Sequence, residues 1–166
     1  IPLIEPQEFK EVHKIEEFVI VIDTSMSCSG ELVKTFLEQT YHILAETESF
    51  FRKIHIRILQ CDNTVQSDMV IHSEAELTRF MEEFELIGGG GTDFRPAFAY
   101  VNELREQGYC RNLGGLLYFT DGKGIYPKQR PEYKTAFLFL EEYDETQVPA
   151  WAIRLKLEPE EFMMQV

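Results

Sequence analysis

Apolar residues along this chain follow two spacings, one typical of buried strands and one typical of amphipathic helices. The string FVIVID at 18–23 is a continuous apolar run rich in β-branched residues, which suits a strand buried on both faces of a parallel sheet. In KIHIRILQCD at 53–62, the alternation of Ile54, Ile56 and Ile58 with polar residues predicts a strand with one exposed face. Further strands are predicted at 69–72, 113–122, 135–140 and 150–157.

Helical spacing separates most of these strands. Apolar residues recur every three or four positions over 31–51, which predicts an amphipathic helix. Ser73 and Glu76 form a capping box that begins a second helix, and Pro96 suits the first turn of a third helix at 95–107. Because strands and helices mostly alternate through long crossovers, we predict an α/β fold with a doubly wound, mostly parallel sheet of about six strands flanked by helices.

Length and composition fit one globular domain. The chain has 166 residues, of which 44% are hydrophobic. We place the domain at 15–158, between a lead-in or linker at 1–14 and a C-terminal tail at 159–166. The first residue, Ile1, is not a methionine, so we expect an upstream segment. No run reaches the roughly 18 apolar residues that a membrane span needs.

Net charge narrows the classes of partner, and the cysteines narrow the kinds of site and the compartment. The net charge of −13 counts against nucleic-acid binding, which depends on Lys and Arg at the phosphates. Cys28, Cys61 and Cys110 are odd in number and contain no CxxC pair, which counts against a disulfide framework and a zinc cage. Thiols that need no pairing suit a reducing compartment, so we expect a cytoplasmic protein.

Two of the predicted strands end on an aspartate. Asp23 ends the apolar run at 18–23 and is followed by the string TSMSCSG, and Asp121 ends the run at 113–122. Ligands of doubly wound sheets bind beyond the carboxyl ends of the strands. We therefore expect both aspartates to belong to one site.

Several chemistries fit this site poorly. A helix cap needs one oxygen, so capping explains at most one of the serines. There is no G-x-S-x-G nucleophile motif and no G-x-x-x-x-G-K-[ST] phosphate loop. Cys28 is interpreted as a small buried thiol rather than a reactive one. No histidine lies near a predicted site loop, and all are interpreted as surface or hydrogen-bonded residues: His13, His42, His55 and His72.

A hard divalent cation fits best, because it prefers carboxylate and hydroxyl oxygens. Asp23, Ser25 and Ser27 alternate, so an extended turn can point all three side chains to one side. Thr92 follows four glycines, whose backbone can approach an ion closely, and Asp121 arrives from another strand end. These five residues are the predicted ligands of Mg²⁺, or of Mn²⁺.

The motif D-x-S-x-S, followed by a loop Thr and a strand-end Asp, resembles the metal-ion-dependent adhesion site (MIDAS) of von Willebrand factor A (VWA) domains. The resemblance covers roughly residues 15–157. The strings GGGGTDFRP and VPAWAIRLKL look more narrowly like a bacterial VWA-like family. In that family the domain lies C-terminal to a region resembling metallopeptidases and often occurs beside AAA+ ATPases of the MoxR type.

The resemblance implies a mechanism of partner binding. Ser25, Ser27 and Thr92 would contact the ion directly, while Asp23 and Asp121 would act largely through bound waters. One position stays open for a Glu or Asp of a protein partner. The expected function is a cation-dependent protein-binding module, without catalysis of its own, in a larger bacterial protein that acts with an AAA+ ATPase. A metal-dependent hydrolase and a structural scaffold with a vestigial site are the alternatives.

Residues around the predicted ion form a candidate partner-binding rim. Met26 stands where the family often has Gly, and it either contacts a partner or packs inward. Asp93 caps the following helix or supports a metal ligand. Lys123, Lys128 and Arg130 belong to the basic string GKGIYPKQRPEYK, which we expect either to steer an acidic partner segment or to form an ordinary solvated loop.

Overall fold

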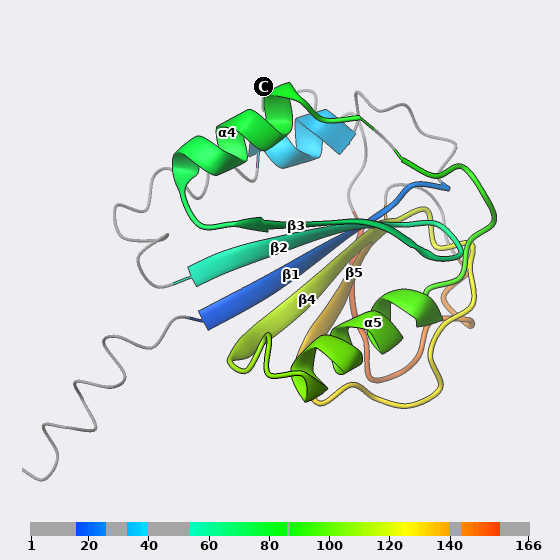
Figure 1. Ribbon diagram of the computed structural model, residues 1–166. Helices are drawn as coiled ribbons and strands as arrows, with labels where there is room; N and C mark the ends of the chain where they lie inside the picture. The colour runs from blue at the N-terminus through cyan, green and yellow to red at the C-terminus, as the bar shows by residue number, and fades with distance from the viewer. Residues whose placement is uncertain (1–15, 26–32, 40–53, 86, 140–143, 157–166) are drawn as a thin grey trace, which may run out of the picture.

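The computed structural model describes residues 16–25, 33–39, 54–85, 87–139 and 144–156 (Figure 1). Residues 33–39 are helical. The other elements, in chain order, are β1 (Glu16–Asp23), β2 (Ile54–Cys61), β3 (Val65–Ile71), α4 (Glu74–Glu82), α5 (Arg95–Glu106), β4 (Leu113–Thr120), β5 (Thr135–Phe139) and β6 (Ile153–Lys156). In the described ranges no helix has the length and apolar character needed to cross a membrane.

The six strands form one sheet in the order β3-β2-β1-β4-β5-β6. All neighbouring strands run parallel except the pair β2 and β3, which is antiparallel. The predicted doubly wound, mostly parallel α/β sheet is therefore confirmed. In the parallel register Asp23 lies opposite Cys61 and Ile22 lies opposite Phe119, so β1, β2 and β4 end at the same edge. This edge is called the carboxyl edge below.

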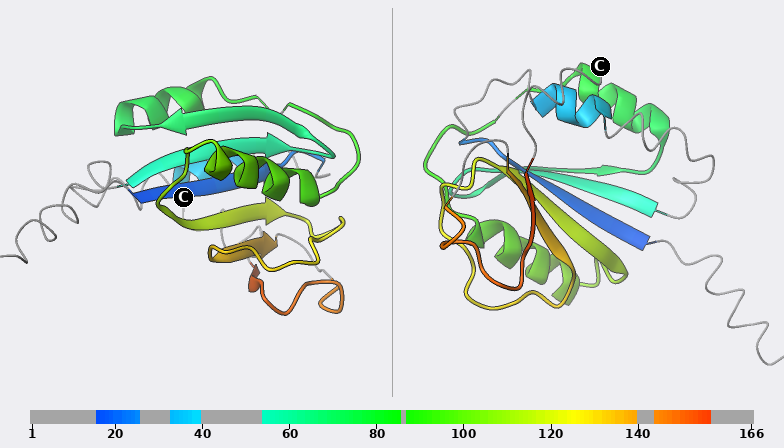
Figure 2. Two further views of the ribbon diagram at one scale, coloured as in Figure 1. Left: turned by 60° about the horizontal axis from the view of Figure 1, so that its bottom comes forward. Right: turned by 180° about the vertical axis from the view of Figure 1, so that it is seen from behind.

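Helices cover both faces of the sheet (Figures 1 and 2). Residues 33–39 and α4 lie on one face, and α5 lies on the other. Strand β1 supplies both cores, with Val19 and Val21 packed on the α5 side and Ile20 and Ile22 on the opposite side. All four side chains are buried, as the apolar run predicts for a central strand.

Strand β2 departs from its prediction. Ile56 and Ile58 are buried as expected, but Leu59, Gln60 and Cys61 are buried as well. The prediction of one exposed face is therefore wrong for the carboxyl half of β2. Its physical reason is that Leu59 and Cys61 pack into the core under α5, while Ile56 and Ile58 pack under α4 and residues 33–39.

Local signals at the helix starts act much as the sequence indicates. The Ser73 hydroxyl accepts a hydrogen bond from the Glu76 N–H at 3.2 Å, so the capping residue is confirmed. The Glu76 carboxylate accepts from the His72 N–H at 2.6 Å instead of returning to Ser73. Pro96 lies in the first turn of α5, as predicted.

Boundaries differ by a few residues. β3 begins at Val65 rather than 69, and β6 is confined to Ile153–Lys156. Of the helix predicted at 31–51, only 33–39 lies in the described part of the chain. The expected lead-in at 1–14 and tail at 159–166 lie outside the described residues.

Candidate functional site

Asp23 is the last residue of β1 and is fully buried. Its Oδ2 accepts a hydrogen bond at 2.5 Å from the hydroxyl of Thr120, the last residue of the adjacent strand β4. Its Oδ1 accepts from the Ser25 N–H at 2.9 Å and also from the Ser25 hydroxyl. Thr120 Oγ1 in turn accepts from the Gly122 N–H at 3.1 Å. The ends of two strands thus fix both oxygens of one carboxylate.

Thr92 reaches this cluster from a loop far along the chain. Its Oγ1 contacts Ser25 Oγ, although 67 positions separate the two residues. Asp23 Oδ1, Ser25 Oγ and Thr92 Oγ1 therefore converge on one place at the carboxyl edge. Hydroxyl hydrogens rotate freely, so both hydroxyl oxygens can present lone pairs to a common ligand.

The glycine-rich loop before Thr92 is held tightly against the strand ends. Gly88 has φ +138°, and a Cβ there would overlap the Thr24 hydroxyl. The Gly90 N–H donates to Asp62 Oδ2 at 3.0 Å, and a Cβ at Gly90 would come within 2.9 Å of the same oxygen. Only residues without a side chain allow this approach, and it fixes the path of the loop toward Thr92.

Asp121 is also buried, directly after β4. Its Oδ1 accepts from the Lys123 N–H at 3.0 Å. Its charge is one of the influences that raise the pKa of Asp23, so the two carboxylates are near neighbours.

Burial is the largest influence on Asp23 and raises its pKa above the ordinary value. The hydrogen bonds from Ser25 and Thr120 lower the pKa, and the charge of Asp121 raises it further. The net shift is upward. Its described hydrogen-bond donors are hydroxyls and an N–H group, none of which is charged. A buried carboxylate with neutral partners is a group whose charge a nearby cation would offset.

The structure brings together most of the predicted ligands, but not all of them are described. Ser25 contacts both Asp23 and Thr92, and Asp121 lies beside Asp23. Ser27, a predicted ligand, and Met26, a predicted rim residue, lie outside the described residues.

Asp93 does not extend the cluster but binds the start of α5. Its Oδ1 accepts a hydrogen bond from the Arg95 N–H at 3.0 Å. Its Oδ2 also forms an ion pair with the Arg95 guanidinium, 2.8 Å from Nη2. The pKa of Asp93 is lowered, chiefly by the Arg95 side chain. Asp93 is thus not the N-cap of α5, which is Phe94 and has no side-chain cap hydrogen bond, but it binds the first turn of the helix from the position before the cap.

The predicted basic residues divide between two places. Lys123 is exposed next to Asp121. Lys128 and Arg130 are also exposed, but they line a pocket between α5 and residues 125–133.

Sequence reasoning missed two residues at this edge, Asp62 and Thr120. Asp62 is buried directly after β2, and it follows an apolar strand just as Asp23 and Asp121 do, which is a signal that could have found it. Thr120 is a hydroxyl residue at the end of an apolar run. Nothing in the sequence marks Thr120 as a partner of Asp23, because the two residues meet only through the pairing of β1 with β4.

The described histidines lie apart from this chemistry, and the described cysteines are buried thiols. His55 and His72 stack edge to face with ring centroids 4.6 Å apart, at the amino end of β2 and opposite the carboxyl edge. Cys61 and Cys110 are free and buried, and burial raises their pKa values to about 11 and about 12. The interpretation of the histidines as surface or hydrogen-bonded residues agrees with His72, which is exposed and lies 3.2 Å from the Glu76 carboxylate. His13, His42 and Cys28 lie outside the described residues.

The donor set limits what the site can bind. The described ranges hold no group of three or more His, Cys, Asp and Glu side chains arranged around a common metal position. The cluster instead combines two carboxylates with hydroxyl oxygens, which are hard donors suited to Mg²⁺ or Mn²⁺. The residues present therefore fit a hard divalent cation.

The family described as a VWA-like domain (DUF2201) matches residues 18–158, and the chain belongs to this family. The comparison with curated proteins found no match.

Among solved structures, proximal thread matrix protein 1 (PTMP1) from the mussel byssus, with a zinc-occupied MIDAS motif, has a similar fold. Its TM-score is 0.64 at 11% identity, over 93% of this chain and 46% of that one, so this chain spans less than half of PTMP1. The SpRpn10 VWA domain has a TM-score of 0.60 at 10% identity, over 92% of this chain and 95% of that one. At such identities the likeness shows a common VWA-type fold.

Proposed function

We propose that this chain is a divalent-cation-dependent protein-binding module. The observation that carries the proposal is the convergence of Asp23, Ser25 and Thr92 oxygens at the carboxyl edge, with Asp121 beside them. VWA domains generally act as protein-interaction modules. The edge where the cluster lies is also where doubly wound sheets bind their ligands.

The ion would be held by Asp23, Ser25, Thr92 and Asp121, together with Ser27. The two carboxylates nearly balance the charge of a dication, so a further carboxylate could approach despite the net charge of −13. When bound, the ion supplies a Lewis-acid position for the Asp or Glu of a protein partner. The hydroxyls of Ser25, Ser27 and Thr92 would contact the ion directly, and the Asp23 and Asp121 carboxylates would hold it largely through bound waters.

Two further observations support the proposal from outside the site. A protein of the same fold, PTMP1, has been solved with zinc in its MIDAS motif, which supports the proposal of a divalent metal here. The strings GGGGTDFRP and VPAWAIRLKL support membership in a larger bacterial cytosolic protein that acts with an AAA+ ATPase of the MoxR type. This larger context is part of the proposal.

Isothermal titration calorimetry with Mg²⁺ and with Mn²⁺ tests the metal site. We expect the wild-type chain to bind one ion, and Asp23→Ala to bind none, because the buried carboxylate is the anionic anchor of the cluster. Asp144→Ala removes an equal charge from an exposed loop residue and should bind like the wild type. Circular dichroism checks that each variant is folded.

A second variant separates loss of a ligand from loss of the fold. Thr92→Val keeps the shape of the side chain and removes only its hydroxyl, so the affinity should fall by at least the roughly tenfold that loss of a residue supporting a metal ligand costs. Absence of binding by the wild type, or equal binding by Asp23→Ala, would leave only the structural scaffold. Turnover of phosphoester or peptide substrates by the wild type, lost in Asp23→Ala, would instead favour the hydrolase.

A further inference from the structure

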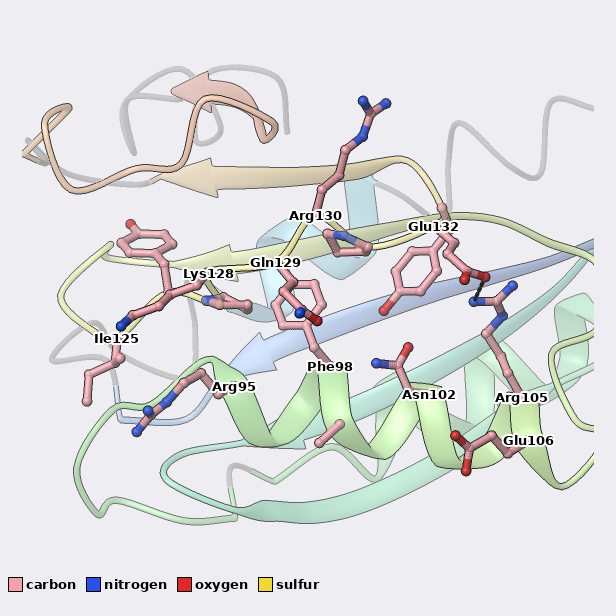
Figure 3. Close-up of a pocket in the computed structure, with 15 residues that line it drawn as sticks. Arg95, Phe98, Asn102, Arg105, Glu106, Ile125, Lys128, Gln129, Arg130 and Glu132 are labelled. Atoms are coloured by element: carbon pink, nitrogen blue, oxygen red, sulfur yellow. Dashed lines mark hydrogen bonds and ion pairs between the residues drawn. The ribbon is translucent and has the colours of Figure 1, made fainter.

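A pocket of about 870 Å³ lies between α5 and residues 125–133 (Figure 3). Arg95, Phe98 and Asn102 line it from the helix, and Lys128 and Tyr126 line it from the loop. The aromatic part of the lining belongs to the core cluster under α5: Phe98 and Tyr133 are members of it, and Tyr126 packs against it. The pocket therefore has aromatic side chains of the core on one side and exposed polar residues of the loop, such as Lys128 and Gln129, on the other.

One end of the pocket adjoins the candidate metal site. The Phe94 N–H donates to the Ile125 carbonyl at 3.1 Å, which ties the loop to the residues that follow Thr92. A Cβ at Gly124 would lie 2.6 Å from Thr92 Cγ2, so the same loop is in close contact with Thr92 itself. Figure 3 shows Ile125 and Arg95 at the end toward which the strand arrowheads point. A chain leaving the metal position can therefore enter the pocket at this end.

The end of the pocket near the metal site carries an exposed lysine, whereas the arginine at the far end is paired with a glutamate. Lys128 is exposed, is in no ion pair within the described part of the chain, and extends toward Ile125 and Arg95 (Figure 3). At the far end Arg105 is paired with Glu132 at 3.2 Å. Arg130 extends away from α5, although it belongs to the same loop (Figure 3). The charge pattern thus points to Lys128 as the cation that faces an entering ligand.

We propose that this pocket receives an acidic, extended segment of the same protein partner that donates a carboxylate to the metal. The inference rests on the proposed function and adds the direction of the partner chain: from the metal, past Lys128, and along α5. Lys128 pairs with a second carboxylate of the segment. In a chain with a net charge of −13, a local positive end is what lets an acidic segment approach this face.

Matched charge reversals test the pocket. The probe is a short fluorescein-labelled peptide in which glutamate alternates with serine, and its binding is followed by fluorescence anisotropy at low ionic strength with Mg²⁺. Lys128→Glu should weaken binding about fivefold to tenfold, because it replaces an attraction with a repulsion. Arg130→Glu changes the net charge equally and lies two residues away, but it should weaken binding less than about twofold. A peptide with glutamine in place of glutamate should not bind.

Blocking the pocket provides a test that does not depend on charge. Ala99 is an exposed residue of α5 that lines the pocket, whereas Glu103 is an exposed residue of α5 outside its lining. Ala99→Trp should abolish binding of the glutamate peptide, and Glu103→Trp should not. Amide chemical-shift changes on titration should fall on residues 95–106 and 125–133.

The outcomes separate this inference from the proposed function. If the wild type binds metal but Lys128→Glu and Arg130→Glu act equally, or the glutamate peptide does not bind, the pocket proposal is wrong and the metal site stands. If calorimetry shows no metal binding but the Lys128→Glu effect persists in chelator, the pocket stands and the metal site falls. Sedimentation that shows self-association lost in Lys128→Glu would assign the pocket to a second copy of the chain and overturn the proposed partner.

Discussion

Asp23 and Asp62 are both aspartates at neighbouring strand ends, but their hydrogen-bond partners differ. Both are buried at the carboxyl ends of the paired strands β1 and β2. Asp62 accepts hydrogen bonds from the N–H groups of Thr64 and Gly90 and from the Gln66 amide, at 3.0–3.1 Å. Asp23 accepts mostly from hydroxyls.

The pKa values of the two aspartates move in opposite directions. Burial raises the pKa of both, but at Asp62 the hydrogen bonds from Gln66, Thr64 and Gly90 outweigh burial and lower the net pKa. At Asp23 burial prevails and the pKa is raised. Amide hydrogens are fixed in direction, whereas hydroxyl hydrogens can turn away to expose an oxygen. Asp62 is therefore a structural anchor, while the surroundings of Asp23 can accommodate a cation.

The largest effect is expected where the glycine-rich loop meets both strand ends. Gly88→Ala should destabilise the chain by about 3 kcal/mol or more, because a Cβ would overlap Thr24 Oγ1 and the backbone has φ +138°. Gly89 has φ +104°, but no atom lies within 4 Å of an added Cβ, so Gly89→Ala should cost about 1–2 kcal/mol. Gly91→Ala, with neither feature, should stay within ~0.5 kcal/mol. Urea unfolding measures the series, and equal costs at all three positions would contradict a close approach at Gly88.

One substitution made at both strand ends tests the difference between Asp23 and Asp62. Asp62→Asn should destabilise the chain by about 1–3 kcal/mol, because an amide NH₂ would face an N–H donor that loses its acceptor. Asp23→Asn, measured in chelator, should cost less than about 1 kcal/mol, since its amide can donate to the Thr120 hydroxyl and a costly buried charge is removed. Urea unfolding of both variants gives the answer. A larger cost at Asp23 than at Asp62 would reverse the assignment of anchor and site.

The smallest effect is a pH dependence at Cys61, which lies between the two aspartates. Burial raises the pKa of this thiol from 9.0 to about 11, and the charges of Asp62 and Asp23 add to the shift. The folded chain therefore keeps the proton to higher pH than the unfolded chain. The contribution to the free energy of unfolding is complete below pH 9 and is lost as the pH rises toward 11.

Urea midpoints measured from pH 8 upward check this dependence, and Cys61→Ala should give a shallower decline than the wild type. Cys110 and Tyr100, whose pKa values are raised to about 12, leave a remaining slope in the variant. An unchanged decline in Cys61→Ala would show that the thiol does not titrate as proposed.

Much of the fold could be predicted from local patterns. The apolar runs located all six strands, and the period of apolar residues located α4 and α5. Errors occurred where tertiary packing decides the outcome. The strand β2 was predicted to have one exposed face, because polar residues alternate with its isoleucines. In its carboxyl half this face is buried, because Leu59 and Cys61 pack under α5.

The candidate site could be predicted only for residues whose type and position at a strand end or on a glycine-rich loop indicate metal binding. Asp23, Ser25, Thr92 and Asp121 were predicted from oxygen chemistry and from the rule that ligands bind beyond parallel strands. Thr120 was not, because its hydrogen bond to Asp23 spans 97 positions and depends on the register of β1 and β4. Such pairings leave no local trace in the sequence.

The sequence alone thus determined which elements form and which polar residues stand at their ends, because hydrophobic periodicity and strand termination are local properties. The tertiary structure alone gives Asp62 hydrogen bonds from N–H groups and gives Asp23 hydrogen bonds mostly from hydroxyls that can rotate. It also placed Lys128 along α5 toward the carboxyl edge and turned Arg130 away. These distinctions arise from contacts between segments distant in the chain, where packing and hydrogen-bond geometry, rather than residue type, set the role of each side chain.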